Sequence, residues 1–149
     1  MITINHIIMC IICDGESLEG LKTLYLCKNV ITIPELPQSL ITLNCSNCHL
    51  LQSLPKLPDS LITLNCKDCT SLVIMPDLQS QCENVDCENC TSLIQLSLKI
   101  PSTLKRLNCA GCINLMFVPV TAHKFISNSQ LEIITHNFFQ WNNKRQNVY

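Results

Sequence analysis

The chain has 149 residues, the length of a single folding unit, of which 47% are hydrophobic and 14% charged, with a formal net charge of -1. This balance excludes an intrinsically disordered tail and a protein that binds nucleic acid through charge. The three glycines, Gly15, Gly20 and Gly111, are too scattered to form a phosphate-binding loop or a dinucleotide fingerprint. Twelve cysteines distinguish the chain, and their spacing carries most of the following predictions.

Residues 1–20 show no targeting signal. The most apolar run, Ile7 to Cys13, is seven residues long, far short of the roughly 20 residues needed to span a bilayer. No Lys or Arg precedes it, as a signal peptide would require. We therefore expect a cytoplasmic protein with reduced thiols and no membrane contact. Ile8, Cys10 and Cys13 share the apolar spacing described next, so residues 1–20 are predicted to form an N-terminal cap or a shortened repeat.

A repeated pattern of about five units occupies residues 21–120. Its landmarks are four Cys-x-x-Cys pairs, whose first members are separated by 21, 21 and 22 residues: Cys45/Cys48, Cys66/Cys69, Cys87/Cys90 and Cys109/Cys112. Leucines keep the same phase, and an earlier unit starts at Leu21 with Asn29 in the place of the second cysteine. A fixed period in the twenties predicts a solenoid.

Each unit is predicted to contain one short strand and an extended return. In Thr42-Leu43-Asn44-Cys45 polar and apolar residues alternate, which is typical of a strand with one buried face. The leucine frame therefore predicts that Leu43, Leu64, Val85 and Leu107 stack inward. Strands one repeat apart can pair only in parallel, because the chain must return before the next strand begins. Prolines such as Pro55 and Pro76 recur in the returns and disfavour helix. We therefore expect extended or polyproline-like returns and little helix.

This pattern resembles the leucine-rich repeat, L-x-x-L-x-L-x-x-N/C-x-L, in its short form. The doublets Leu36-Pro37 and Leu57-Pro58 are similar to those of the LPX subtype in bacterial effectors and in repeat proteins of giant viruses. The resemblance implies a leucine-rich repeat solenoid, a right-handed superhelix with a parallel β-sheet on its concave face and convex returns. It also implies the host cytosol as the location if the chain is viral or effector-derived.

Residues 121–149 lie beyond the leucine frame, which ends at Val120. Apolar residues gather there at Leu131, Ile133, Ile134, Phe138, Phe139 and Trp141, followed by a polar stretch. We expect a C-terminal cap over the last turn and a frayed tail.

The cysteine pairs allow more than one interpretation. Two Cys-x-x-Cys pairs 17 residues apart fit a four-thiolate zinc site, so a structural zinc protein using the eight paired cysteines is the alternative function. The same positions are the inward sites of the repeat, where cysteine packs as a small apolar group. We favour packing, with no metal and no cofactor. Disulfides between adjacent turns are a third interpretation, because a strand spacing of about 4.8 Å lies within the range that a disulfide tolerates.

No combination of residues predicts catalysis. Cys27 is placed at an outward position beside Lys28, yet no histidine falls at a matching position to act as its base. The four histidines, His6, His49, His123 and His136, share no metal-ligand spacing. We therefore expect a protein that is not an enzyme.

Outward strand positions form columns across the predicted sheet, with equivalent residues about 5 Å apart. The predicted binding residues are Tyr25, Thr42, Asn44, Thr63, Asn65, Asn84, Asp86, Arg106 and Asn108. A solvated strand face also carries polar residues without any binding role. We predict a monomeric interaction module that binds a protein or peptide there, and neither nucleic acid nor membrane. The competing surface is the aromatic and basic segment Phe138 to Arg145.

Overall fold

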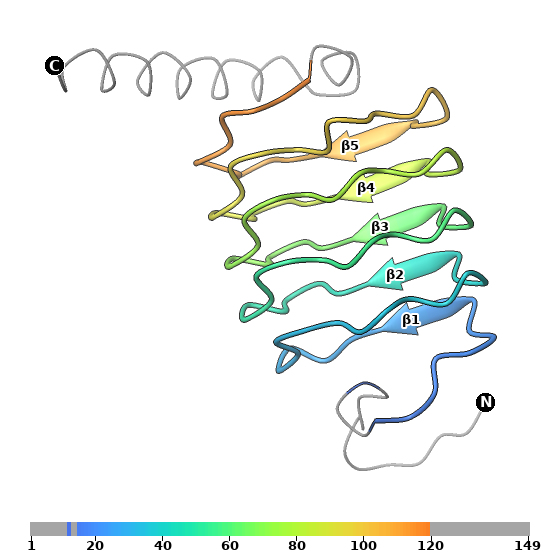
Figure 1. The fold of residues 1–149 in the computed structure, drawn as a ribbon. Helices are drawn as coiled ribbons and strands as arrows, with labels where there is room; N and C mark the ends of the chain where they lie inside the picture. Colours follow the sequence, from blue (N-terminus) through green and yellow to red (C-terminus); the bar gives the residue numbers. More distant parts are fainter. Residues whose placement is uncertain (1–11, 13–14, 120–149) are drawn as a thin grey trace, which may run out of the picture.

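The computed structural model describes residue 12 and residues 15–119, which form a parallel β-solenoid (Figure 1). Its strands are β1 (Thr23–Tyr25), β2 (Thr42–Asn44), β3 (Thr63–Asn65), β4 (Asn84–Asp86) and β5 (Arg106–Asn108). They form one sheet in the order of the sequence, and every neighbouring pair is parallel. The prediction of a solenoid with repeats of about 21 residues is confirmed.

The centre of each strand points into the core. Cα pairing aligns the central residues in one row, and each is at most 6% exposed: Leu24, Leu43, Leu64, Val85 and Leu107. Because neighbouring side chains alternate across a strand, the flanking residues of all five strands lie on the opposite, outward face. The inward stack predicted from the leucine frame is therefore confirmed, and the outward columns are in register.

A tight turn follows each strand from β2 onward. Cys48 N donates to Cys45 O across 3.2 Å, and Asn47, the second of the two residues between them, has a φ of 63°. The equivalent residues Asp68 and Asn89 have φ values of 58°, and Gly111 has 70°. Asn, Asp and Gly tolerate this left-handed conformation better than other residues. The Cys-x-x-Cys spacing therefore contains a turn signal, Asn, Asp or Gly at the third position.

In two units, a Pro-x-Ser-Leu turn precedes the strand and fixes where the strand segment starts. Leu40 N donates to Pro37 O across 3.1 Å, and Leu61 N donates to Pro58 O across 3.1 Å. Ser60 Oγ donates to Leu40 O of the preceding turn across 2.6 Å. The Leu-Pro doublets thus mark a point where one turn is bonded to the next.

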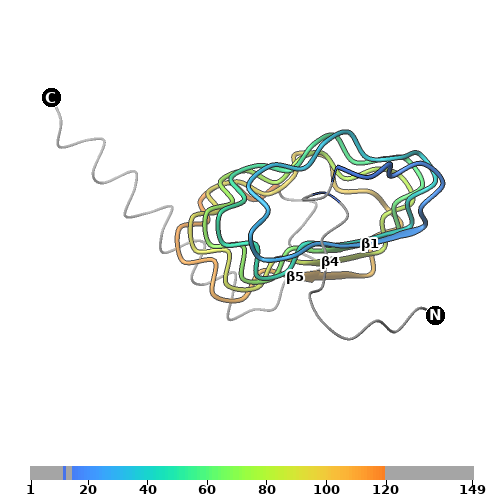
Figure 2. The same cartoon turned by 90° about the horizontal axis from the view of Figure 1, so that it is seen from below.

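The returns lie opposite the strands, as the view along the solenoid shows (Figure 2). They contain no helix between residues 15 and 119, as expected. Isolated parallel bridges link Ser53 to Ile74, Ile74 to Gln95 and Gln95 to Phe117. The returns are therefore extended and pair with one another, though over a single residue per turn.

The first unit departs from the predicted frame. Val30, not Asn29, occupies the inward site of the second cysteine: Val30 is 2% exposed, whereas Asn29 is exposed. The turn closes through Val30 N and Cys27 O at 3.2 Å, one residue later than in the other units. Burying Val30 removes apolar surface from water and leaves the amide of Asn29 hydrated. The assignment of Asn29 to the core was wrong.

Several predictions concern residues outside the described part of the chain. They include most of the N-terminal cap, the C-terminal cap with its tail, and the segment Phe138 to Arg145.

Candidate binding face

The outward face of the sheet brings together the predicted binding residues from five strands. Tyr25 and Arg106 are exposed at the two ends, whereas the residues between them on β2, β3 and β4 are half-buried. Pairing places Thr42 opposite Thr63, and Asn44 opposite Asn65. The columns predicted from the sequence are therefore present, and their role in binding stays a prediction.

One column has a structural role that the sequence analysis missed. Asn44 Oδ1 accepts a hydrogen bond from Ser46 N at 3.0 Å, and Asn65 Oδ1 accepts one from Lys67 N at 3.0 Å. Asp86 and Asn108 accept equivalent bonds at 3.1 and 3.2 Å. Asn and Asp commonly bond in this way to the backbone two residues ahead. The column therefore starts the tight turns. In the sequence, the signal for this role was an Asn or Asp directly after the buried central residue of the strand.

The charged side chains that flank β3, β4 and β5 are largely paired with one another. Lys67 Nζ lies 2.9 Å from Glu88 Oε2, and this hydrogen bond raises the pKa of Lys67. Lys105 Nζ lies 2.8 Å from Glu83 Oε2. Asn108 Nδ2 donates to Asp86 Oδ1 at 3.1 Å and to Glu88 Oε2 at 3.3 Å. Two of the acidic side chains near β4, Glu83 and Glu88, are therefore paired with lysines, and the third, Asp86, accepts a hydrogen bond from Asn108.

The β1 end of the face differs from the rest. The Tyr25 side chain is 67% exposed, the highest exposure among the large hydrophobic residues of the described chain. Lys22 and Lys28, on either side of β1, are exposed. Within residues 15–119 neither lysine forms an ion pair. This end thus offers an aromatic ring and two cations to a ligand.

The cysteines of the four pairs line the core and act as hydrogen-bond donors. The first cysteine of a pair donates to a carbonyl of the following turn: Cys45 to Asn65 O, Cys66 to Asp86 O and Cys87 to Asn108 O, at 3.4, 3.3 and 3.1 Å. The second donates to the preceding turn: Cys48 to Cys27 O, Cys69 to Cys45 O, Cys90 to Cys66 O and Cys112 to Cys87 O, at 3.2, 3.0, 3.0 and 3.0 Å. Thiols therefore connect each turn to its neighbours in both directions.

The burial of the paired cysteines agrees with the packing interpretation, and zinc binding by them stays an alternative prediction. The ten described cysteines are free thiols, and nine of them are buried. Burial raises the pKa of Cys82 to about 11 and that of Cys109 to about 12, so both stay neutral at pH 7. In the described part of the chain, no three His, Cys, Asp or Glu side chains are placed to hold a metal ion.

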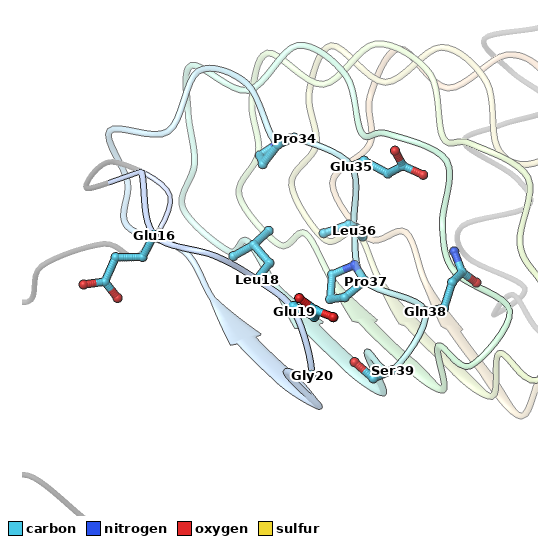
Figure 3. Close-up of a pocket in the computed structure, with 10 residues that line it drawn as sticks. All are labelled: Glu16, Leu18, Glu19, Gly20, Pro34, Glu35, Leu36, Pro37, Gln38 and Ser39. Carbon is cyan, nitrogen blue, oxygen red and sulfur yellow. The ribbon is translucent and has the colours of Figure 1, made fainter.

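A pocket of about 730 Å³ lies at the β1 end of the solenoid, away from the strand face (Figure 3). Two segments line it, one around Leu18 and Glu19 and one from Pro34 to Ser39. Its hydroxyl group, Ser39 Oγ, donates to Leu21 O at 2.8 Å and so serves the turn. The lining holds three carboxylates, those of Glu16, Glu19 and Glu35, and no histidine, lysine or cysteine.

The fold and its aligned polar face define a repeat protein of the parallel β-solenoid class. No known family, curated protein or solved structure matches the chain. None of the described residues belongs to a helix that is long and apolar enough to cross a membrane.

Proposed function

We propose that this protein is a non-enzymatic leucine-rich-repeat module that binds a protein or peptide segment on the concave face of its sheet. The observation that carries the proposal is the β1 end of the outward face. There an exposed tyrosine stands beside two exposed lysines, on a face whose other charges are mostly paired. The in-phase Leu and Cys positions support the repeat family.

The contact is proposed to centre on Tyr25. A ligand that binds at β3 to β5 must displace existing pairs such as Lys67 with Glu88, which offsets most of what it gains. At β1 no such pair has to break. Tyrosine often dominates binding energy at interfaces because its ring buries a large area at a small entropic cost. The hydroxyls of Thr42 and Thr63 extend the surface along the sheet.

The partner segment is proposed to be acidic. Carboxylates placed beside Lys22 and Lys28 complement their charge, and such complementarity increases the association rate and selects against basic partners. Polar groups of the partner would form hydrogen bonds with the hydroxyls of Thr42 and Thr63.

The face carries no group arrangement for catalysis. His49, the histidine within residues 15–119, is exposed and follows the β2 turn, outside the strand face. The buried thiols of the core donate hydrogen bonds to carbonyls, and Cys82 and Cys109 have pKa values too high for nucleophilic attack at pH 7.

Selection from a displayed peptide library, followed by affinity measurements, tests the proposal. We expect acidic peptides, and we expect the combined change Lys22→Ala, Tyr25→Ala and Lys28→Ala to weaken their binding at least about 10-fold. Exposed substitutions usually change stability by no more than about 0.5 kcal/mol, so the variant should melt like the parent protein.

The matched control changes three exposed residues of the β2 return, Gln52→Ala, Lys56→Ala and Asp59→Ala. It should bind the selected peptides normally. Equal binding by both variants, or selection of basic peptides, would contradict the proposal.

A further inference from the structure

The two cysteines of each Cys-x-x-Cys pair point to opposite neighbours. Cys45 Sγ donates forward to Asn65 O of the next turn, whereas Cys48 Sγ donates backward to Cys27 O of the preceding one. The two sulfurs of one pair therefore diverge. The first cysteine of one turn and the second cysteine of the following turn, by contrast, reach toward each other.

Three such diagonal pairs are in contact: Cys45 with Cys69, Cys66 with Cys90 and Cys87 with Cys112. In the two outer pairs the second cysteine, Cys69 or Cys112, has a lowered pKa, whereas hydrogen bonds raise the pKa of Cys90 in the middle pair. The thiols of Cys45 and Cys69 are hydrogen-bonded to each other, and Cys69 Sγ also lies 3.0 Å from Cys45 O. The thiols of Cys87 and Cys112 are bonded in the same way, with Cys112 Sγ 3.0 Å from Cys87 O. The four side chains of the outer pairs are at most 3% exposed. Sulfurs already in contact need only a small movement to reach the bonding distance of a disulfide.

We propose that Cys45–Cys69 and Cys87–Cys112 are modification sites at which hydrogen peroxide forms disulfides that join adjacent turns. In the first step a cysteine sulfur attacks the peroxide, the O–O bond breaks, and a sulfenic acid and one water form. In the second step the partner thiol attacks the sulfenic sulfur, the S–S bond forms, and a second water leaves. Two thiols and one peroxide thus give one disulfide and two waters, and the peroxide is the species reduced.

The order of attack within each pair follows from the hydrogen bonds. The bond with Cys45 lowers the pKa of Cys69, and it raises the pKa of Cys45. The bond with Cys87 lowers the pKa of Cys112, and it raises the pKa of Cys87. Because the thiolate is the nucleophile, the second cysteine attacks peroxide and the first closes the disulfide.

A disulfide is also the oxidised form that suits these surroundings. It is neutral, and it replaces two neutral thiols in a core that provides no counter-ion. A link between residues 24 or 25 positions apart closes one full turn of the solenoid. Closing a loop of this size restricts the unfolded chain, so we expect the melting temperature to rise by about 5 °C or more per link.

The test uses the reduced full-length chain, treated with hydrogen peroxide and then with an alkylating reagent, digested without reductant and analysed by mass spectrometry. We expect linked peptides containing Cys45 with Cys69 and Cys87 with Cys112, and a rise in melting temperature that a dithiol reductant reverses. Links within one motif, such as Cys45–Cys48, a link between the equivalent positions Cys48 and Cys69, or sulfinic acids without links would overturn the proposal.

Two variants distinguish the diagonal pairs from general thiol oxidation. Cys69→Ala should abolish the first link, keep the second, and lose the part of the temperature rise due to the first. Cys82→Ala removes a buried thiol outside the four motifs and should keep both links. If Cys69→Ala does not fold, Cys45→Ala tests the same link from its other end. Unchanged oxidation products in the variant that folds would also overturn the proposal.

Discussion

Polar residues in each tight turn have two separate roles. Asn65 accepts a hydrogen bond from Lys67 N, and Asp68, three positions later, adopts a positive φ of 58°. Asn89 Nδ2 also donates to Asp68 Oδ1 at 3.0 Å, which connects two successive turns. The polar residues around the sheet therefore hold the backbone as well as facing solvent, so substitutions there affect folding.

Replacing Asn65 should reveal this structural role. Asn65→Ala removes the acceptor for Lys67 N, and we expect a loss of about 1 kcal/mol in the free energy of unfolding. Asn65→Asp keeps an acceptor at the same position, as Asp86 does in the next turn, and should cost less. Urea unfolding of both variants measures the difference. An alanine variant as stable as the aspartate variant would show that the hydrogen bond contributes nothing.

The individual strands are too short to be stable alone. Each contains three residues, and each buries one central side chain against the neighbouring turns. Stability in such an array comes from the contacts between adjacent units, so a defect in a middle turn affects both halves. β3 is the central strand of the five, and its core residue Leu64 is fully buried.

Leu64→Asp should therefore unfold the array. A carboxylate at this position has no cationic partner, and burying it costs several kcal/mol. Thr63→Asp, on the same strand but on its outward face, is the control and should leave the fold intact. Circular dichroism during urea titration reports both outcomes. Cooperative unfolding of Leu64→Asp at the urea concentration of the parent protein would contradict the assignment of Leu64 to the core.

The described turns share one continuous hydrophobic core, and its thiols make the stability depend on pH. Ten cysteines are described. Burial raises the pKa values of two of them, Cys82 and Cys109, because it disfavours the charged thiolate. In the folded state these pKa values are about 11 and about 12, against an ordinary value of 9.0. Because folding favours the protonated thiols, their contribution is complete below pH 9 and is lost as the pH rises through the folded values.

We therefore expect the free energy of unfolding to fall as the pH rises from about 9 toward 11. Urea unfolding at several pH values in this window, in the presence of a reductant, measures the slope. Cys82→Ala should reduce it, because this variant lacks one of the thiols whose ionisation favours the unfolded chain. A constant stability up to pH 11 would show that these thiols are not buried.

The period of the repeat was enough to predict most of the fold. Leu43, Leu64 and Val85 were assigned to one inward stack because they share a phase, and the pairing register agrees. The first unit was less predictable, because its turn is displaced by one residue and Val30 takes the inward site. The pattern of a single unit cannot reveal that shift, because burial at this site depends on the packing of the next turn.

The sequence by itself determined the solenoid, its period, its strands and which strand side chains face the core, because these follow from local alternation repeated at a fixed spacing. Only the tertiary structure decided how side chains of different turns meet. The pairing of Lys67 with Glu88 and the contact of Cys45 with Cys69 join residues more than 20 positions apart. Such contacts depend on the direction of each side chain after the turns have stacked, and no spacing along the chain specifies that direction.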